Sequence, residues 1–390
     1  MLVFDKKIRI VLTGGGTGGH IFPLLAVAEE LWEIDAKLKQ DLELYYIGPI
    51  QGPFAFDPVI FEGLNIKVVP ISSESPNNAT NPFTKLVSVF KSAWGSVQCL
   101  WHLWRIMPYA IFSKGGYGAL PVLIVGFLYR IPIVIHESDA SPGKINELSK
   151  KFASRIAVAF EKSASFFPPE KTALVGNPIR RQFFESDPRD AAYEHFHFSR
   201  DLPVIFITGG SQGAKTLNDL VLNILPFLLE KYQIIHQCGS RNHEEVFTES
   251  AVIVQDLSET VKLRYHLLGS LDERGMRYAY EISSLVVSRS GSGSIFEIAA
   301  KGKPSILVPL AASARDHQRD NAYDYAKTGA AIVLEENNLK SRMFFETINL
   351  LMENPGKLNQ MASAAKSFAR PEAAQTIARE LLRLSDVVIP

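Results

Sequence analysis

The first residues suited to chemistry form a glycine-rich run that ends in a histidine. Residues 13–20 read TGGGTGGH, and their glycines match G-x-G-x-x-G, a turn that lets the backbone approach a phosphate at a helix N-terminus. His20 stands where the loop becomes a helix, so it is either a residue that caps and packs or a titratable group beside an anion-binding loop. The loop residues predicted to meet a ligand are Thr17, Gly18 and Gly19.

A strand and a helix must position this loop. The apolar residues 8–12 predict a buried strand, and the apolar spacing from Ile21 to Leu31 predicts a helix. The next predicted strand, 42–47, is followed by Gly-Pro and lacks the terminal acid that holds the ribose of NAD. The motif alone is compatible with a dinucleotide site, a nucleotide site or a structural turn, and the missing acid counts against NAD.

Length and composition narrow the class of protein. The chain has 390 residues, a length that predicts two domains, and 46% of them are hydrophobic. Its formal net charge of zero gives no support to a nucleic-acid partner. Cys99 and Cys238 lie far apart in apolar settings, which favours a reducing compartment over disulfides or a metal site. The N-terminus does not read as a signal peptide, and the apolar run 119–128 is too short to span a bilayer. We expect a soluble, cytoplasmic protein.

Polar turns follow further predicted strands of the first half. Strand 109–113 runs into KGGYG, which includes Gly116 and Tyr117, and strand 131–135 runs into HESD, which includes Glu137 and Asp139. The carboxyl edge of an open parallel sheet is where ligands bind, so we assign these residues to a site that they share with His20. Glu137 has a structural alternative, because it could instead support a backbone turn.

Apolar residues at helical spacing over 86–104 include three tryptophans, with lysine, histidine and arginine between them. The simpler interpretation is a long helix that covers the sheet. The functional interpretation is an aromatic and basic face that rests on an anionic membrane surface.

The second half repeats the plan of the first. Strand 202–208 leads into GGSQGA, which includes Ser211 and Gln212, and a helix follows. The polar stretch 187–202 separates the halves and predicts a linker. We expect two Rossmann-like, doubly wound parallel-sheet domains that face each other across a cleft. The predicted boundaries are 1–186 for the first domain, with a terminal helix at 371–390 packed back on it, and 187–370 for the second.

Two more polar clusters follow strands of the second half. After strand 285–288 the chain reads RSGSGS, and Ser294 with Glu297 has the spacing of a capping box. Glu297 either satisfies its own helix or accepts hydrogen bonds from the hydroxyls of a ribose, and the spacing does not separate these roles. The run RDHQRDN at 315–321 carries the density of polar groups that a buried sugar requires.

Together these motifs resemble the MurG family of N-acetylglucosaminyltransferases, in glycosyltransferase family 28, over nearly the whole chain. They read TGGGTGGHIFP at 13–23, GGY at 115–117, HE at 136–137, GNP at 176–178, GGSQGA at 209–214, RSG at 289–291 with Glu297, and HQ at 317–318 with NA at 321–322. The resemblance implies a GT-B fold and inverting transfer of N-acetylglucosamine (GlcNAc) from UDP-GlcNAc to the C4 hydroxyl of N-acetylmuramic acid (MurNAc) in lipid I. The product would be lipid II, for peptidoglycan synthesis.

The resemblance also implies partners and a place in the cell. It implies a peripheral enzyme on the cytoplasmic face of an anionic membrane, a lipid-linked acceptor and contact with other proteins of cell-wall synthesis. The chain contains no Asp-x-Asp, so we expect no metal at the diphosphate and no cofactor. Helix N-termini can stabilise the departing diphosphate instead.

Site roles follow from the resemblance position by position. His20 is the favoured base or an acceptor-site residue, and Glu137, the second residue counted as catalytic, lies in the acceptor cleft. Glu297 holds the ribose, and Leu271 and Met276 border the uracil. The residues implied on the acceptor side are Thr17, Gly18, Gly19, Gly116, Tyr117 and Asp139, and those implied for UDP-GlcNAc are Thr17, Gly18, Asp139, Arg180, Ser211, Gln212, Leu271, Met276, Ser290, Ser294, Glu297, His317 and Gln318.

The chain departs from the family at a few positions. Ser138-Asp139 stands where the family has Gln-Asn, and Lys114 stands where a small residue is common. Gly293 replaces a bulkier residue, and loops 51–80 and 269–276 are atypical. These departures concern the fine structure of the acceptor site more than the reaction class.

Three other functions remain compatible with the motifs. One is a related GT-B transferase with another acceptor, and a second is a UDP-GlcNAc 2-epimerase, which should carry extra acids near the sugar. The third is a non-catalytic protein that binds nucleotide-sugars, against which the joint presence of His20, Glu137 and Glu297 argues.

Overall fold

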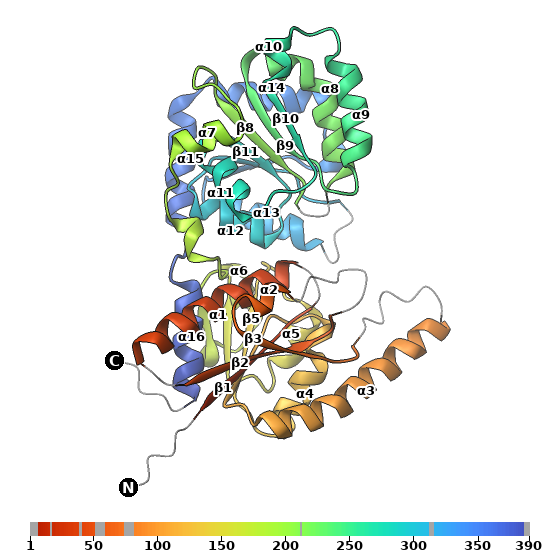
Figure 1. Cartoon of the computed structure of the whole chain (residues 1–390), viewed down its shortest axis with the longest axis vertical. Helices are drawn as coiled ribbons and strands as arrows, with labels where there is room; N and C mark the ends of the chain where they lie inside the picture. Colours follow the sequence, from red (N-terminus) through yellow and green to blue (C-terminus); the bar gives the residue numbers. More distant parts are fainter. Residues whose placement is uncertain are drawn as a thin grey trace. The chain divides into compact units, whose positions relative to one another are not determined.

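Two compact units make up the chain in this computed structural model (Figure 1). One comprises residues 1–181 with 370–390, and the other comprises 182–369. The structure describes residues 7–15, 18–38, 41–50, 59–73, 82–210, 213–311 and 316–385.

The first unit is built on a seven-stranded sheet in the order β3-β2-β1-β4-β5-β6-β7. All of its paired strands are parallel, and its direction of winding reverses between β1 and β4. The carboxyl ends of two strands at such a switch point open a crevice where ligands bind. The strands are β1 Ile8–Thr13, β2 Leu42–Gly48, β3 Ile66–Pro70, β4 Ala110–Ser113, β5 Ile133–Glu137, β6 Arg155–Val158 and β7 Thr172–Leu174.

Helices cover both faces of this sheet. Side chains along β1 alternate between the two faces of the sheet. Ile10 and Leu12 pack with α1 and α16 on one face, whereas Val11 packs with α3 and α4 on the other. The C-terminal helix α16 packs against α1 in the lower part of Figure 1. The helices are α1 Gly18–Leu38, α2 Val59–Glu62, α3 Pro82–Ile106, α4 Leu120–Leu128, α5 Lys144–Ser149, α6 Glu161–Ala164 and α16 Ala373–Leu384.

The second unit has a six-stranded parallel sheet in the order β10-β9-β8-β11-β12-β13, with its switch point between β8 and β11. Its strands are β8 Val204–Thr208, β9 Gln233–Gln237, β10 Tyr265–Leu268, β11 Ser283–Ser288, β12 Ser305–Leu307 and β13 Ala331–Val333. Its helices are α7 Arg189–His195, α8 Lys215–Lys231, α9 His243–Val254, α10 Glu259–Lys262, α11 Glu273–Ile282, α12 Ser292–Ala300, α13 His317–Ala326, α14 Ser341–Met352 and α15 Pro355–Phe368.

The stretch expected to be a linker, 187–202, contains the helix α7 instead. Apart from Asp187, its charged residues face solvent, but Ala192, Phe196 and Phe198 are buried, and α7 packs on α11. Asp187 is itself buried, where it pairs with Lys301 at 3.0 Å. The polar composition of this stretch therefore gave no sign of α7, which a few apolar residues hold against the second unit.

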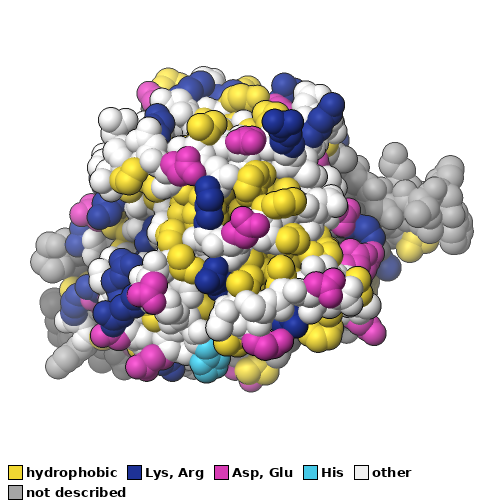
Figure 2. Space-filling view, turned by 90° about the horizontal axis from the view of Figure 1, so that it is seen from above, with side chains coloured by type: hydrophobic (Ala, Val, Ile, Leu, Met, Phe, Trp, Pro, Cys, Tyr) yellow, Lys and Arg dark blue, Asp and Glu magenta, His cyan; other side chains and the backbone are white. Residues whose placement is uncertain are grey.

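The tryptophan-rich segment forms α3, which covers the sheet along one side only. Cys99 and Leu103 are buried against the sheet, whereas Trp94, Trp101 and Trp104 are 59%, 57% and 59% exposed. Large apolar residues also reach the surface elsewhere, and Figure 2 shows such side chains gathered between charged ones on one face. Within the described ranges, no helix combines the length and apolar character needed to cross a membrane.

Candidate functional site

His20 lies in the first turn of α1, against two glycine-containing loops. A Cβ at Gly15 would lie 2.6 Å from His20 Nδ1, and a Cβ at Gly116 would lie 3.2 Å from His20 Cε1. Gly116 also has φ +78°, which L side chains rarely adopt. Burial, and secondarily the charge of Lys114, lower the pKa of His20 to about 4. The imidazole is therefore neutral near pH 7 and able to accept a proton.

Lys114 follows β4 and reaches beneath these loops with its side chain buried. Its ammonium donates hydrogen bonds to His136 Nδ1 at 2.6 Å, to Ser138 Oγ at 2.7 Å and to Asn177 Oδ1 at 3.1 Å. His136 Nε2 donates to the carbonyl of Gly176 at 2.8 Å, which fixes the tautomer whose Nδ1 accepts from the lysine. One side chain thus connects the segments that follow β4, β5 and β7.

Glu137 ends β5 and organises the loop that follows it. Its carboxylate accepts hydrogen bonds from the N–H groups of Asp139 at 3.0 Å and Gly143 at 2.9 Å, and from Asn146 Nδ2 at 2.9 Å. Burial, then the neighbouring Asp139, raise the pKa of Glu137 above its usual value. These contacts match the turn-supporting alternative, in which the carboxylate positions the loop that carries Asp139.

Other predicted site residues of the first unit lie on the same sheet edge or beside α1, and among them Arg180 was predicted for UDP-GlcNAc and not for the acceptor side. Tyr117 begins the short turn after Gly116, and its carbonyl accepts a hydrogen bond from Ser73 Oγ at 3.0 Å. Arg180 stacks its guanidinium 5.3 Å from the ring centre of Phe22, on α1. Gly18 and Gly19 begin α1, and Thr17 lies outside the described residues.

In the second unit, glycines in the left-handed region of backbone conformation stand on both sides of residues 211–212, between β8 and α8. Gly210 and Gly213 have φ values of +79° and +76°, and the N–H of Gly210 donates to Thr208 Oγ1 at 3.0 Å. A turn of this kind directs N–H groups toward the start of the next helix. Ser211 and Gln212, predicted to bind the diphosphate here, lie outside the described residues.

The loop after β11 is held by a buried ion pair. Arg289 Nη2 contacts Glu336 Oε1 at 2.6 Å, and Arg289 Nη1 donates to the carbonyl of Val308 at 3.1 Å. Glu336 Oε2 also accepts from the N–H of Ala311 at 2.9 Å. The pair thereby connects the loops that follow β11, β12 and β13. Such pairs are costly to break, because one buried charge is left without a partner.

The structure brings together Ser290 and Gln318, two residues predicted to bind UDP-GlcNAc. Ser290 Oγ donates to the backbone carbonyl of Gln318 at 2.7 Å, and Gln318 Oε1 accepts from the N–H of Leu310 at 3.1 Å. His317 begins α13, and its buried Nδ1 has no hydrogen-bond partner among the described residues. An unpartnered buried nitrogen of this kind favours a polar ligand.

Glu297 does not occupy the capping-box position that its spacing with Ser294 suggested. The helix α12 has Gly291 as its N-cap, so Ser294 is already the third helical residue and Glu297 lies further inside. Glu297 Oε2 instead accepts a hydrogen bond from Tyr280 Oη at 3.2 Å. The carboxylate remains half-buried near the start of α12, where a ribose could meet it.

Leu271 and Met276 flank the start of α11. Asp272 caps this helix by accepting from the N–H of Gly275 at 2.7 Å, and a Cβ at Gly275 would lie 2.8 Å from Leu271 Cδ2. Both predicted uracil neighbours are half-buried.

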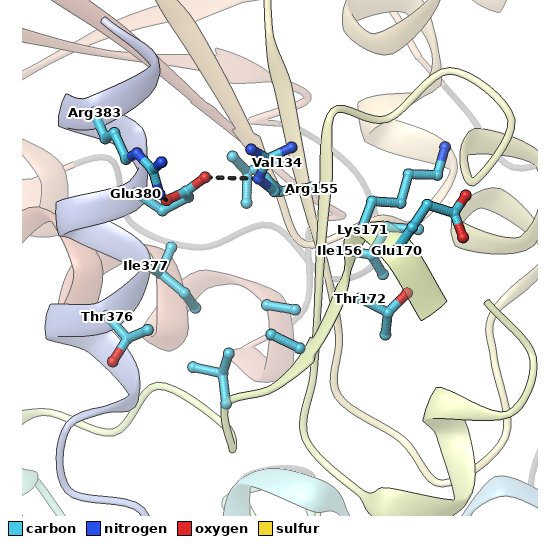
Figure 3. Close-up of a pocket in the computed structure, with 13 residues that line it drawn as sticks. Val134, Arg155, Ile156, Glu170, Lys171, Thr172, Thr376, Ile377, Glu380 and Arg383 are labelled. Carbon is cyan, nitrogen blue, oxygen red and sulfur yellow. Dashed lines mark hydrogen bonds and ion pairs between the residues drawn. The ribbon is translucent and has the colours of Figure 1, made fainter. Parts of the chain in front are cut away.

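Figure 3 shows a cavity of ≈ 290 Å³ in the first unit that is separate from these residues. It lies between α16 and strands β5 to β7, where Arg155 pairs with Glu380 at 2.8 Å, and its lining contains none of the predicted site residues. In the part of the chain that the structure describes, no group of three His, Cys, Asp or Glu side chains is placed to hold a metal ion.

Sequence reasoning did not assign site roles to Lys114, Asn146, Asn177 or the Arg289–Glu336 pair. The signal for Lys114 was its place directly after a strand and before two glycines, and it was noted only as a departure from the family. The partners of these residues come from other strands, so spacing along the chain does not reveal them.

Two open parallel sheets, each with polar loops at its switch point, define a two-domain nucleotide-binding protein of the α/β class. The chain matches the glycosyltransferase family 28 N-terminal domain over residues 10–158 and the C-terminal domain of that family over residues 204–377. The chain belongs to glycosyltransferase family 28, as its motifs predicted.

Full-length relatives and solved structures agree with this placement. A Bacillus cereus protein, 34% identical over 96% of this chain and 99% of its own length, is named UDP-N-acetylglucosamine–N-acetylmuramyl-(pentapeptide) pyrophosphoryl-undecaprenol N-acetylglucosamine transferase 2. A Halothermothrix orenii protein with the same name but no number is 33% identical over 95% of this chain and 97% of its own length. The crystal structure of Acinetobacter baumannii MurG is similar with a TM-score of 0.71 and 25% identity, over 96% of this chain and 99% of that one. The predicted GT-B fold is confirmed.

A UDP-GlcNAc 2-epimerase from Neisseria meningitidis shares the fold with a TM-score of 0.69. It is 14% identical, over 97% of this chain and 100% of that one. That likeness extends to the fold alone.

Proposed function

We propose that the chain transfers GlcNAc from UDP-GlcNAc to the C4 hydroxyl of MurNAc in lipid I, which forms lipid II with inversion at the anomeric carbon. The observation that carries this proposal is 34% identity over 96% of the chain to a relative named for this transfer. The neutral His20 at the switch point of the first sheet supplies a group suited to the chemistry.

On the acceptor side, His20 takes the proton of the C4 hydroxyl. The hydroxyl oxygen forms a bond to the anomeric carbon, while the bond from that carbon to the diphosphate breaks and UDP leaves with the electron pair. A base must be neutral to take this proton, and His20 is neutral near pH 7 because burial lowers its pKa to about 4, which also makes it a weaker base than an exposed histidine. Glu137 contributes by holding the loop after β5 in place.

On the donor side, the second unit binds the nucleotide and the sugar. The N-terminal ends of α8 and α12, with Ser290, stabilise the negative charge of the leaving diphosphate. Glu297 accepts hydrogen bonds from the ribose hydroxyls, and His317 and Gln318 meet the hydroxyls of GlcNAc. No metal is required in this arrangement, which uses helix ends and neutral donors.

The two domains divide the substrates between them. Residues 1–186 with 371–390 take the acceptor and associate with the membrane, and residues 187–370 bind UDP-GlcNAc. The exposed tryptophans of α3 rest on the anionic cytoplasmic face of the membrane, where the lipid-linked acceptor is found. Other proteins of cell-wall synthesis meet the enzyme there.

The release of UDP tests this function. We expect release from UDP-GlcNAc only when a lipid I analogue is present, and little release from UDP-GalNAc or UDP-glucose. His20→Gln should lower turnover about 100-fold or more and leave the Kd for UDP unchanged by calorimetry. Release that is independent of acceptor, or equal losses of turnover and UDP affinity in His20→Gln, would contradict the assignment.

A further inference from the structure

Three departures from the family pattern meet at one point of the first unit. Lys114, Ser138 and Asp139 stand where the family has a small residue and Gln-Asn. Lys114 Nζ donates to Ser138 Oγ at 2.7 Å, and the charges of Lys114 and Asp139 act on one another and on His20. Substitutions that are scattered in the sequence are therefore neighbours in the fold.

The hydrogen-bond partners of Lys114 match the three N–H donors of an ammonium, the charged form of the side chain. An ammonium has three N–H donors, and Lys114 meets three acceptors, none of them a carboxylate: His136 Nδ1, Ser138 Oγ and Asn177 Oδ1. A neutral amine has only two N–H donors, so Ser138 would have to donate its hydroxyl to the amine instead of accepting from it. The segments after β4, β5 and β7 thus hold a positive charge beside the glycine loops.

Lys114 and His20 are neighbours on either side of Gly14. Gly14 separates the two residues, since a Cβ at Gly14 would lie 3.4 Å from His20 Cβ and 3.5 Å from Lys114 Cβ. The charged groups that act on His20 are Lys114, from the segment after β4, and Asp139, from the loop after β5.

We propose that Lys114, Ser138 and Asp139 act as one charge-balanced unit in which Lys114 is a positioning residue whose ammonium disfavours a proton on His20. Its value for transfer rests on the proposed function: burial already keeps His20 neutral near pH 7, and the lysine charge extends that neutral range into more acidic solution. The negative charge of Asp139 acts on His20 in the opposite sense to that of Lys114 and so limits the influence of the lysine. Ser138 fixes the direction of the ammonium through its hydrogen bond.

The titration behaviour agrees with this geometry. Burial lowers the pKa of Lys114 to about 7, although Glu137 and Asp139 act to raise it, so the lysine is charged across the acidic range in which His20 titrates. His136 faces Lys114 too, and burial and that charge hold its pKa well below the usual value. The lysine therefore has two imidazoles beside it that remain neutral.

The test is an NMR titration of the full chain with ¹³C-labelled histidine, in which His20→Gln identifies the signal of His20. In the wild type, we expect His20 to stay neutral down to about pH 5. Lys114→Met should raise the pKa of His20 by about one unit or more, as expected for the loss of a nearby charge at partial burial. Asp139→Asn should lower it, and the double variant should lie between the single variants.

Lys303→Met is the matched control, because Lys303 is also a buried lysine, but it belongs to the second unit and donates to the carbonyls of Glu281 and Ser283. It should leave the His20 titration unchanged. An unchanged pKa of His20 in both Lys114→Met and Asp139→Asn would overturn the proposal, and Asp139→Asn alone decides the matter if Lys114→Met fails to fold.

Kinetics separate this inference from the proposed function. If His20 is the base, the acid limb of kcat/KM moves with the NMR titration in each variant. If the titration moves and the acid limb does not, the charge-balanced unit stands and the assignment of His20 as base fails. Restoring the family pattern with Lys114→Thr, Ser138→Gln and Asp139→Asn together should recover much of the activity that Lys114→Thr loses alone, and no recovery would count against a single unit.

Discussion

Glu297 is the residue on which the affinity of the protein for UDP should depend most directly. Its position inside α12 rules out the capping-box role, and its half-buried carboxylate has Tyr280 as one donor. Glu297→Ala should weaken UDP binding about 10- to 100-fold, the usual cost of hydrogen bonds to a charged group. Calorimetry measures this, with Tyr280→Phe as a control that keeps the carboxylate and changes affinity by a few-fold at most. An unchanged Kd for UDP in Glu297→Ala would show that Glu297 does not bind the ribose.

Glu137 offers a second prediction at this scale, because its carboxylate accepts from two backbone N–H groups and one amide. In Glu137→Gln, the new NH₂ group must face at least one of those donors. We expect a loss of about 1–3 kcal/mol in stability and faster hydrogen exchange over residues 138–146, together with reduced turnover.

The exchange measurement separates positioning from direct catalysis. Reduced turnover with unchanged exchange over 138–146 would mean that Glu137 touches the reacting groups. UDP affinity serves as the control and should change less than turnover, because Ser290, Glu297 and Gln318 belong to the other unit.

Among the elements, α3 is the one that should bind membranes. Trp94, Trp101 and Trp104 are each more than half exposed. Changing all three to Ala should lower binding to anionic vesicles by about 10-fold or more, because each indole removes apolar area from water when it inserts. Phe247→Ala with Val252→Ala on α9, also exposed, is the matched control. Equal binding by both variants in vesicle sedimentation would exclude α3 as the contact.

The sequence predicted most elements of the fold, because buried strands between glycine-rich turns leave a strong local pattern. The first predicted strand, 8–12, is Ile8–Thr13 in the structure, and that predicted at 42–47 is Leu42–Gly48. Periodicity gave α3 as a helix, but it could not say that the tryptophans face away from the sheet. It also missed α7, whose composition is that of a polar linker.

At the scale of the whole molecule, buried neutral histidines should make stability depend on pH. Burial lowers the pKa of His236, in the second unit, to about 3, and its ring nitrogens lie 2.9 Å from Tyr265 Oη and 3.1 Å from Asn218 Oδ1. Between pH 6.5 and 3 the unfolded chain binds a proton at His236 that the folded chain does not. Stability is therefore present above pH 6.5 and is lost as the pH falls, by up to about 1.4 kcal/mol per pH unit.

Urea unfolding at pH 7.5, 6.5 and 5.5 checks this dependence. The free energy of unfolding of the wild type should fall more steeply than that of His236→Gln, which has no group to titrate at this position. Parallel slopes for the two proteins would show that His236 is not the source.

The site was predictable from the sequence only in outline. Strand ends followed by polar turns placed His20 and Glu137 on one sheet edge, since the carboxyl ends of parallel strands share an edge. The hydrogen bonds of Lys114 to residues up to 63 positions away depend on the order of the strands in the sheet, which no local pattern encodes. The same holds for Arg289 and Glu336, which are 47 positions apart.

The most direct test of the central claim is the identity of the product. The protein should be incubated with UDP-GlcNAc, labelled in the sugar, and a MurNAc-pentapeptide linked through diphosphate to a lipid. We predict that the label appears in a lipid-linked GlcNAc–MurNAc disaccharide with a β linkage to the C4 oxygen, identified by mass spectrometry and NMR. Label that remains in free GlcNAc, or in an epimerised UDP-sugar regardless of acceptor, would contradict the account.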